Sequence, residues 1–346
     1  MQKIVYTNDV AQAITAFVSE MNPASVHIIT DSNVKEAVLP GLSLDYPVIT
    51  VSPGDENKNL ESLSLIWSSL ISQGATRKSL IINIGGGVVT DMGGFAAATF
   101  KRGVRFINVP TTLLSAVDAA VGGKTGINFD GLKNEIGAFA PADAVVISTV
   151  LFESLPKTEL LSGYAEMLKH GLLSSADNYT SLLNFDILDA DLTRLLPLLE
   201  NSVRVKEKIV TEDPCEKGIR RALNLGHTAG HAFEALAMHK GRPIPHGHAV
   251  AFGILVEMII SHTQEGFPSA QLYRYASYLK EQGYGSPEIS CNDYDALIAY
   301  MRHDKKNDTP SQINFTLLSA PGVPLIDRTA SEKDILAAFD IFRDLI

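Results

Sequence analysis

The stretch from residue 79 to residue 94 (SLIINIGGGVVTDMGG) constrains the fold most, because it joins a strand, a glycine turn and the start of a helix. Residues 80–84 are mostly apolar, which is typical of a short strand buried on both faces of a sheet. The three glycines at 85–87 accept the positive φ angles of a sharp turn and leave the main chain open to a ligand. Residues 93–99 favour a helix, and the N–H groups and dipole at a helix start favour a phosphate.

The spacing of these glycines fits neither of the two common phosphate-binding motifs. It is not Gly-x-Gly-x-x-Gly, and no Lys followed by Ser or Thr comes after it, so the dinucleotide fingerprint and the Walker pattern are both excluded. This stretch alone therefore leaves a structural turn and a nucleotide site equally open.

Strand and helix patterns alternate over the first 150 residues. Further strands are predicted at 26–30, 48–51, 105–109 and 145–147, with helices at 9–21 and 61–73 between them. This alternation predicts an α/β domain with a doubly wound parallel sheet over residues 1–150. Ligands of such sheets bind at the carboxyl ends of the strands, where polar turns follow. Those turns contain Asp31, Asp55, Gly86 and Thr111.

From residue 152 onward, strand patterns nearly vanish and long helical patterns take over. We expect helices at 158–173, 189–209, 222–237 and 249–264. The second predicted domain, residues 151–346, is therefore all helical.

Charge and composition exclude several classes of protein. The 346 residues carry a formal net charge of −10, which excludes a general nucleic-acid surface. Only two cysteines are present, so no disulfide framework is expected. The first residues contain no apolar signal core, and no run of about 18 apolar residues exists, so we expect no membrane segment and a cytoplasmic location.

The predicted helical domain is rich in histidine. The sequences HTAGH at 227–231 and HGH at 246–248 contain four histidines, and histidines four residues apart share one helix face. The first group lacks the glutamate of the HExxH motif, which excludes a zinc protease of that type. One glutamate and two histidines from three elements would suit zinc with one open position, and Glu166 shares a helix face with Lys169. A single histidine of this kind is more often an ordinary polar residue, so both interpretations stay open.

The stretch 111–134 is polar and rich in glycine. It carries Asp118, Lys124, Lys133 and Asn134, and a loop of this length inside a domain is usually functional or disordered. Its apolar residues argue against disorder. A plain solvated loop remains the alternative.

Taken together, stretches along nearly the whole chain resemble the 3-dehydroquinate synthase family of the sugar-phosphate cyclase superfamily. The stretches that carry the resemblance are PGDENK at 53–58, GGGVVTD at 85–91, KRG at 101–103, VPTTLLSAVDAAVGGKTGIN at 109–128, LKNEIGAF at 132–139, GYAEMLKHG at 163–171, RRALNLGHTAGHAFEA at 220–235, HGHAV at 246–250 and DKK at 304–306. No single block is specific, but the joint match is.

The resemblance implies a carbon–oxygen lyase of the shikimate pathway. Such an enzyme converts 3-deoxy-D-arabino-heptulosonate 7-phosphate to 3-dehydroquinate and phosphate, with catalytic NAD and a divalent metal ion, zinc or cobalt. The steps implied are oxidation, loss of phosphate, return of the hydride, ring opening and an aldol closure. NAD would lie in the cleft between the two domains, and the chain would form a homodimer.

The resemblance also implies roles for individual residues. The expected metal ligands are Glu166, His227 and His246, and His231 is expected to carry protons. The residues expected to bind NAD are Asp31, Asn33, Asp55, Lys58, Gly86, Gly87, Val88, Asp91, Thr111, Thr112, Lys133, Leu151 and Ser154. Those expected to bind substrate are Arg102 (across a dimer interface), Asp118, Lys124, Lys133, Asn134, Lys169, Lys206, Arg220, Asn224, His231, and one or both of Lys305 and Lys306. Of these, Lys124, Asn134, Lys169 and His231 are the expected catalytic residues.

Several positions depart from the family pattern. Ser154 stands in place of threonine, Thr90 in place of glycine, and Ala119 and Ala120 in place of two serines. His248 stands where an acidic residue is common, which places a rival ligand two residues from His246.

Three alternatives stay open. Another sugar-phosphate cyclase, or a metal-dependent polyol dehydrogenase similar to glycerol dehydrogenase, would share the architecture. A regulatory NAD-binding module would leave the Glu/His set without a task. The many lysines and arginines, spread along an acidic chain, favour a doubly anionic small substrate.

Overall fold

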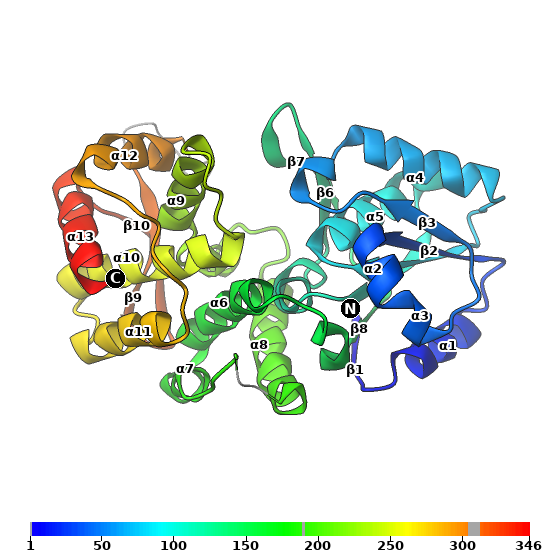
Figure 1. Cartoon of the computed structure of the whole chain (residues 1–346), viewed down its shortest axis with the longest axis horizontal. Coiled ribbons are helices and arrows are strands. Elements are labelled where there is room, and N and C mark those ends of the chain that lie inside the picture. Colours follow the sequence, from blue (N-terminus) through cyan, green and yellow to red (C-terminus); the bar gives the residue numbers. More distant parts are fainter. Residues whose placement is uncertain (1, 189–190, 304–311) are drawn as a thin grey trace. The chain divides into compact units, whose positions relative to one another are not determined.

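The computed structural model describes residues 2–188, 191–303 and 312–346, and the chain forms two compact units (Figure 1). The first unit is Met1–Leu155 with Asp191–Val203, and the second is Pro156–Ala190 with Arg204–Ile346. The predicted boundary lies at residue 150, and the predicted second domain includes Asp191–Val203.

The first unit contains a six-stranded sheet in the order β1-β8-β5-β4-β2-β3, with every strand pair parallel. The strands are β1 (Lys3–Tyr6), β2 (Val26–Asp31), β3 (Val48–Val51), β4 (Leu80–Gly85), β5 (Arg105–Pro110) and β8 (Ala144–Ile147). Every residue of β2, β4 and β8 is buried, as expected of strands covered on both faces. The predicted parallel sheet is confirmed. The edge strand β1 was not predicted, because it is only four residues long and shows no clear strand pattern.

Helices connect these strands. They are α1 (Val10–Met21), α2 (Ser32–Ala37), α3 (Leu39–Leu42), α4 (Leu60–Ser72) and α5 (Gly87–Thr99), with short turns η1 (Asp55–Asn57), η2 (Phe100–Arg102) and η4 (Thr149–Phe152). Helix α5 begins at the third glycine of the turn, earlier than the helical pattern from residue 93 suggests. Its residues Met92, Ala96 and Ala97 are fully buried in the core that also holds Leu63 and Ile66 of α4.

The polar stretch after β5 is ordered secondary structure, and the expectation of a long loop is wrong there. A π-helical turn, η3 (Ser115–Ala119), is followed by an antiparallel hairpin of β6 (Lys124–Phe129) and β7 (Leu132–Phe139). The hairpin strands meet at Gly126 and Gly137, where a Cβ would collide with the opposite main chain. Because glycine weakens strand patterns, sequence analysis missed this pair.

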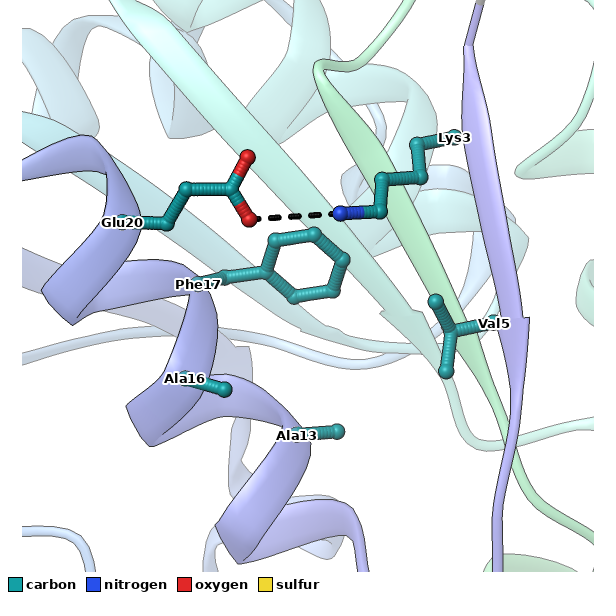
Figure 2. Close-up of a pocket in the computed structure, with 6 residues that line it drawn as sticks. All are labelled: Lys3, Val5, Ala13, Ala16, Phe17 and Glu20. Carbon is teal, nitrogen blue, oxygen red and sulfur yellow. Dashed lines mark hydrogen bonds and ion pairs between the residues drawn. The ribbon is translucent and has the colours of Figure 1, made fainter.

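A shallow pocket lies between β1 and α1, as Figure 2 shows. Lys3 pairs with Glu20 at 3.2 Å and lies 4.9 Å from the ring centre of Phe17. The residues that line this pocket are Lys3, Val5, Ala13, Ala16, Phe17 and Glu20. They include none of the expected site residues, so this pocket is not the candidate site.

The second unit is mainly helical. Its helices are α6 (Lys157–Ser174), α7 (Ala176–Leu183), the end of α8 (Leu192–Glu212), α9 (His227–His239), α10 (His246–Glu265), α11 (Ser269–Glu281), α12 (Tyr294–Arg302) and α13 (Glu332–Leu345), with turns η5 (Ile219–Asn224) and η6 (Cys291–Asp293). The unit is not all helical, because β9 (Asn314–Ala320) and β10 (Val323–Thr329) form an antiparallel pair. Phe315, Leu317 and Leu318 of β9 are buried, so this strand packs in the core of the unit.

Helix α9 begins later than the sequence pattern predicts. The pattern from residue 222 predicts a continuous helix, but α9 begins at His227, after the separate turn η5. Gly226 between them has a φ of +80°, which interrupts the helix. Within the described ranges, no helix has both the length and the apolar content that crossing a membrane requires.

Candidate functional site

Glu166, His227 and His246 come together in the second unit from α6, α9 and α10. Their ligand atoms all lie within 4.8 Å of one another. The Nε2 atoms of His227 and His246 lie 3.5 Å and 3.9 Å from Glu166 Oε1. Two ligands bound tetrahedrally to one zinc ion lie roughly 3.4 Å apart, since each bond is about 2.1 Å long. The donor set and its spacing therefore fit a metal ion with an open position.

Glu166 is the buried centre of this cluster. It is 0% exposed, and neither carboxylate oxygen accepts a well-formed hydrogen bond from the residues that the structure describes. It forms an ion pair with Lys169, which lies one helical turn further on and is also buried, and it lies close to the two histidines. A buried carboxylate with so few hydrogen bonds is costly unless a cation neutralises it.

Glycines let the three helices approach closely enough to form the cluster. A Cβ at Gly247, next to His246, would lie 2.6 Å from Ser162 Cα of α6. A Cβ at Gly230 of α9 would lie 2.9 Å from the carbonyl oxygen of Ala249 in α10. At Gly253 the α10 main chain lies directly against α9. Main-chain contact at these points sets the distances between the candidate ligands.

Second partners orient both histidines. His227 Nδ1 lies 3.1 Å from the carbonyl oxygen of Leu225, and His246 Nδ1 lies 3.1 Å from Glu234 Oε2. An N–H on each Nδ1 would donate to these acceptors, which leaves each Nε2 lone pair facing Glu166. Metal-bound histidines are commonly held in this way.

The other two histidines have different surroundings. The ring of His231 lies 5.4 Å from that of His227 and 5.9 Å from that of His246, beside the cluster rather than in it. His248 is buried, with its ring nitrogens 3.2 Å from the Tyr284 carbonyl oxygen and 3.3 Å from that of Thr158. Because both ring nitrogens face main-chain carbonyl oxygens, His248 is not oriented as a rival metal ligand.

The expected substrate residue Arg220 lies in η5 and contacts the loop that precedes it. The Arg220 side chain is buried and donates to the Pro214 carbonyl oxygen at 2.7 Å. The Asp213 carboxylate accepts from the main-chain N–H groups of Lys217, Gly218 and Arg220 at 3.0, 2.7 and 3.2 Å. The bond from the Lys217 N–H, with the two others, holds the pKa of Asp213 below its usual value. Asp213 thus fixes the loop that presents Arg220.

Lys206 and Asn224 complete the expected substrate residues of this unit that are described. Lys206 is buried, and Asn224 is half-buried, with its amide 3.4 Å from Glu216 Oε1. Lys305 and Lys306 lie outside the described residues.

In the first unit, the glycine turn is tightly packed on one side. The Thr111 N–H donates to the Gly85 carbonyl oxygen at 3.0 Å, and a Cβ at Gly86 would lie 3.2 Å from Thr112 Cγ2. Gly86 precedes α5 and has no side chain with which to cap it. Thr90 bonds back to the carbonyl oxygens of the first turn, so the family departure at this position is accommodated within the helix. The main-chain N–H groups at this helix start suit an anion.

Lys58 joins the two sets of residues expected in the first unit. Its side chain is buried, and Nζ donates to Asp91 Oδ2 and Asn134 Oδ1, each at 2.5 Å. Lys133, next to Asn134 on β7, pairs with Asp55 at 3.3 Å. The hairpin β6–β7 therefore brings expected substrate residues next to expected NAD residues.

The remaining expected residues of this unit differ in how deeply they are buried. Asp31 is buried and caps α2, with Oδ1 accepting from the Val34 N–H at 3.0 Å. Those that are exposed are Asn33, Arg102, Lys124 and Ser154. Those that are half-buried or buried are Val88, Gly87, Asp118 and Leu151. A Cβ added at Gly87 would lie 3.4 Å from Ala119 Cβ, which is an ordinary contact distance. The alanine at position 119 therefore leaves the turn unobstructed.

Two residues with clear roles in the site escaped the sequence analysis. Glu234 falls within the stretch that carries the resemblance, three residues after His231, and this helical spacing was a usable signal. Asp213 had no comparable signal, because its three main-chain donors follow from the loop conformation alone.

Comparison with known proteins gives the following matches. Residues 48–162 match the model of the 3-dehydroquinate synthase N-terminal domain, and residues 163–307 match that of the C-terminal domain. The 3-dehydroquinate synthase of Parabacteroides distasonis is 48% identical over 348 residues, which is 99% of this chain and 98% of that protein.

Two solved structures have the same fold. A 2-deoxy-scyllo-inosose synthase complexed with carbaglucose-6-phosphate, NAD+ and Co2+ has a TM-score of 0.85 at 23% identity, covering 99% of this chain and 96% of that one. The 2-epi-5-epi-valiolone synthase of Streptomyces hygroscopicus subsp. jinggangensis, with NAD+ and Zn2+ bound, has a TM-score of 0.85 at 21% identity, covering 99% and 97%.

Proposed function

Because the chain belongs to the 3-dehydroquinate synthase family, we propose that it converts 3-deoxy-D-arabino-heptulosonate 7-phosphate to 3-dehydroquinate and phosphate, with NAD and a divalent metal ion as cofactors. One observation carries the proposal within the second unit. The imidazoles of His227 and His246 lie beside the buried carboxylate of Glu166, a set of three side chains that could hold the ion such a reaction requires.

Glu166, His227 and His246 would hold the metal ion. When bound, the ion polarises the hydroxyl group that is oxidised and the carbonyl group that results. His231 lies beside the candidate ligands, and we assign it the movement of a proton to or from the substrate. His248 has no part in the site, since its ring nitrogens face main-chain carbonyl oxygens.

Buried cations near the start of α9 and in α6 and α8 would bind the anionic substrate. Lys169, Lys206 and Arg220 are all buried, and each brings a positive charge to a protein with a net charge of −10. The substrate carries a carboxylate and a phosphate, and both prefer charge-assisted hydrogen bonds. The 2-deoxy-scyllo-inosose synthase of the same fold is complexed with carbaglucose-6-phosphate, which supports a substrate of this class.

NAD would bind to the first unit. The uncapped start of α5 at Gly86 and Gly87 suits the pyrophosphate, and Lys58 with Asp91 suits a polar group further along the cofactor. Asn134 and Lys133, tied to the same group of residues, would meet the substrate there. A homodimer in which Arg102 contributes across the interface remains a prediction from the resemblance, and a cytoplasmic location remains a prediction from the sequence.

One assay distinguishes this cyclase from a polyol dehydrogenase of the same fold. In a cyclase the hydride returns to the substrate, so we expect one phosphate per substrate consumed and no net NADH, with NAD below the substrate concentration supporting many turnovers. Phosphate and NADH absorbance are followed in the same cuvette. NADH that accumulates in step with substrate loss, without phosphate, would assign the chain to the dehydrogenases.

A pair of histidine variants tests the metal ligands. We expect His246→Ala to lose both bound metal and turnover, and His248→Ala to retain the metal. Metal content of both purified variants is measured after equal dialysis. Full metal occupancy in His246→Ala would reject the ligand assignment.

A further inference from the structure

The carboxylate of Glu257 is fully buried at the start of α9, although the proposed reaction gives it no task. Glu257 belongs to α10, and its side chain reaches the neighbouring helix. Its Oε2 accepts from the Gly226 N–H at 2.6 Å, and its Oε1 faces the Ala229 N–H at 3.4 Å. A buried carboxylate destabilises a fold unless strong partners offset its desolvation, so this placement points to a specific role.

The two contacts complete a cap that α9 cannot form from its own sequence. In a capping box, the side chain of the residue before the helix accepts from the third N–H of the helix, and the third side chain accepts from the N–H before the helix. In α9 those two positions are Gly226 and Ala229, and neither side chain contains an acceptor. Glu257 faces both N–H groups with one carboxylate. Its negative charge also lies at the positive end of the helix dipole.

The cap has to come from another helix because of how α9 and α10 pack. Gly226 has a φ of +80°, and a Cβ there would lie 2.9 Å from both the Ile254 nitrogen and the Val250 carbonyl oxygen. No residue with a capping side chain fits at that position. The close approach that forms the candidate metal cluster thus removes the ordinary cap, and Glu257 replaces it.

We propose that Glu257 is a positioning residue for His227. His227 is the first residue of α9, so the place where the helix begins sets the place of its imidazole. The Leu225 carbonyl oxygen that lies against His227 Nδ1 belongs to the same turn, and Glu257 fixes that turn through Gly226. This inference rests on the proposed function, in which His227 is a metal ligand.

The test measures metal affinity rather than activity. Metal-free protein is titrated with Zn2+ or Co2+ against a competing chelator. Glu257→Gln keeps the size of the side chain but presents an NH2 group to one of the two N–H donors, and we expect metal affinity to fall roughly tenfold. Ile260→Val, a buried change on the same helix, is the control for general loss of stability, and its metal affinity should equal that of the wild type.

A double-mutant cycle shows whether Glu257 acts through His227. We expect Glu257→Gln to have no further effect on the residual affinity of His227→Ala, but its full effect in His246→Ala. Unchanged affinity in Glu257→Gln, or an equal loss in both histidine backgrounds, would overturn the proposal. Glu257→Asp keeps the charge and withdraws the carboxylate by one methylene group. If Glu257→Gln does not fold, Glu257→Asp must show the same pattern.

The His227→Ala variant by itself separates the two levels of the proposal. If it binds metal as tightly as the wild type, the ligand set of the proposed function is rejected. If it loses metal while Glu257→Gln does not, the ligand set stands and only the role of Glu257 is rejected.

Discussion

Replacing Gly247 by alanine should separate two candidate metal ligands without touching either. A Cβ at this position would lie 2.5 Å from the carbonyl carbon of Ser162 and 2.6 Å from its Cα. Both atoms belong to the main chain of α6, so no side chain can turn aside. The carbonyl oxygen of Ser162 would lie closer still. Ordinary contact begins near 3.4 Å, and α10 must therefore move by at least about 0.9 Å.

That displacement is large on the scale of metal coordination. His246 Nε2 lies 3.9 Å from Glu166 Oε1, and a movement of α10 directly away from α6 would increase this to at least about 4.8 Å. Two ligands bound to one zinc ion cannot be further apart than about 4.2 Å, since each bond is at most about 2.1 Å. One ligand must then be lost. We expect metal affinity to fall at least about 100-fold, more than an outer-sphere change usually costs.

The same variant should lose stability as well. Overpacking of this kind costs about 1–3 kcal/mol, which lowers the Tm of the metal-free protein by roughly 2–12 °C for a domain of this size. Calorimetry gives the Tm, and a chelator competition gives metal affinity. Gly41→Ala is the control, because a Cβ there meets no atom within 4 Å. If Gly247→Ala binds metal as tightly as the wild type, the contact between Gly247 and α6 does not set the spacing of the ligands. That conclusion holds even if the Tm of the variant is lower.

Three further predictions address separate parts of the chain. Lys58→Met should weaken NAD binding at least about tenfold while metal affinity is kept, because Asp91 and Asn134 lose the charge-assisted bonds that the buried ammonium group donates. Unchanged NAD affinity in a fluorescence titration would contradict this. Glu234→Gln should lower metal affinity about tenfold by weakening the contact to His246, and equal titration curves would count against it. The bond from the Lys217 N–H lowers the pKa of Asp213 from 3.8, so the contribution of this carboxylate to loop stability is complete above pH 3.8 and is lost as the pH falls through the lowered pKa. Protection of the Lys217 amide, measured relative to its intrinsic exchange rate, should therefore fall only in that acid range, and Asp213→Asn should abolish this change in protection.

The sequence alone determined the parallel sheet and the residues on which the site depends. A buried strand followed by three glycines predicts the same strand and turn wherever it occurs, because the apolar run and the missing side chains are local properties. The expected positive φ angles are wrong, since none of these glycines has one; a Cβ at Gly85 would instead lie 2.6 Å from Val89 Cβ. The structure confirms β4, the turn and α5 in that order. The resemblance indicated Glu166, His227 and His246, which the structure brings within 4.8 Å of one another.

Other features depended on contacts between segments far apart in the chain. The hairpin β6–β7 escaped prediction because its strands meet at glycines, which carry no pattern. The break at Gly226 could not be read either, since nothing local shows that α10 leaves no space for a side chain there.

The side chains that orient the candidate ligands also depend on contacts between segments far apart in the chain. Glu234 reaches His246, and Glu257 reaches the start of α9, each across a helix–helix contact. A sequence shows that a glutamate is present, but whether it is buried and which donor it meets depend on how closely two helices pack. The sequence therefore determined which side chains are available for the chemistry, and only the tertiary structure decided which groups hold them in place.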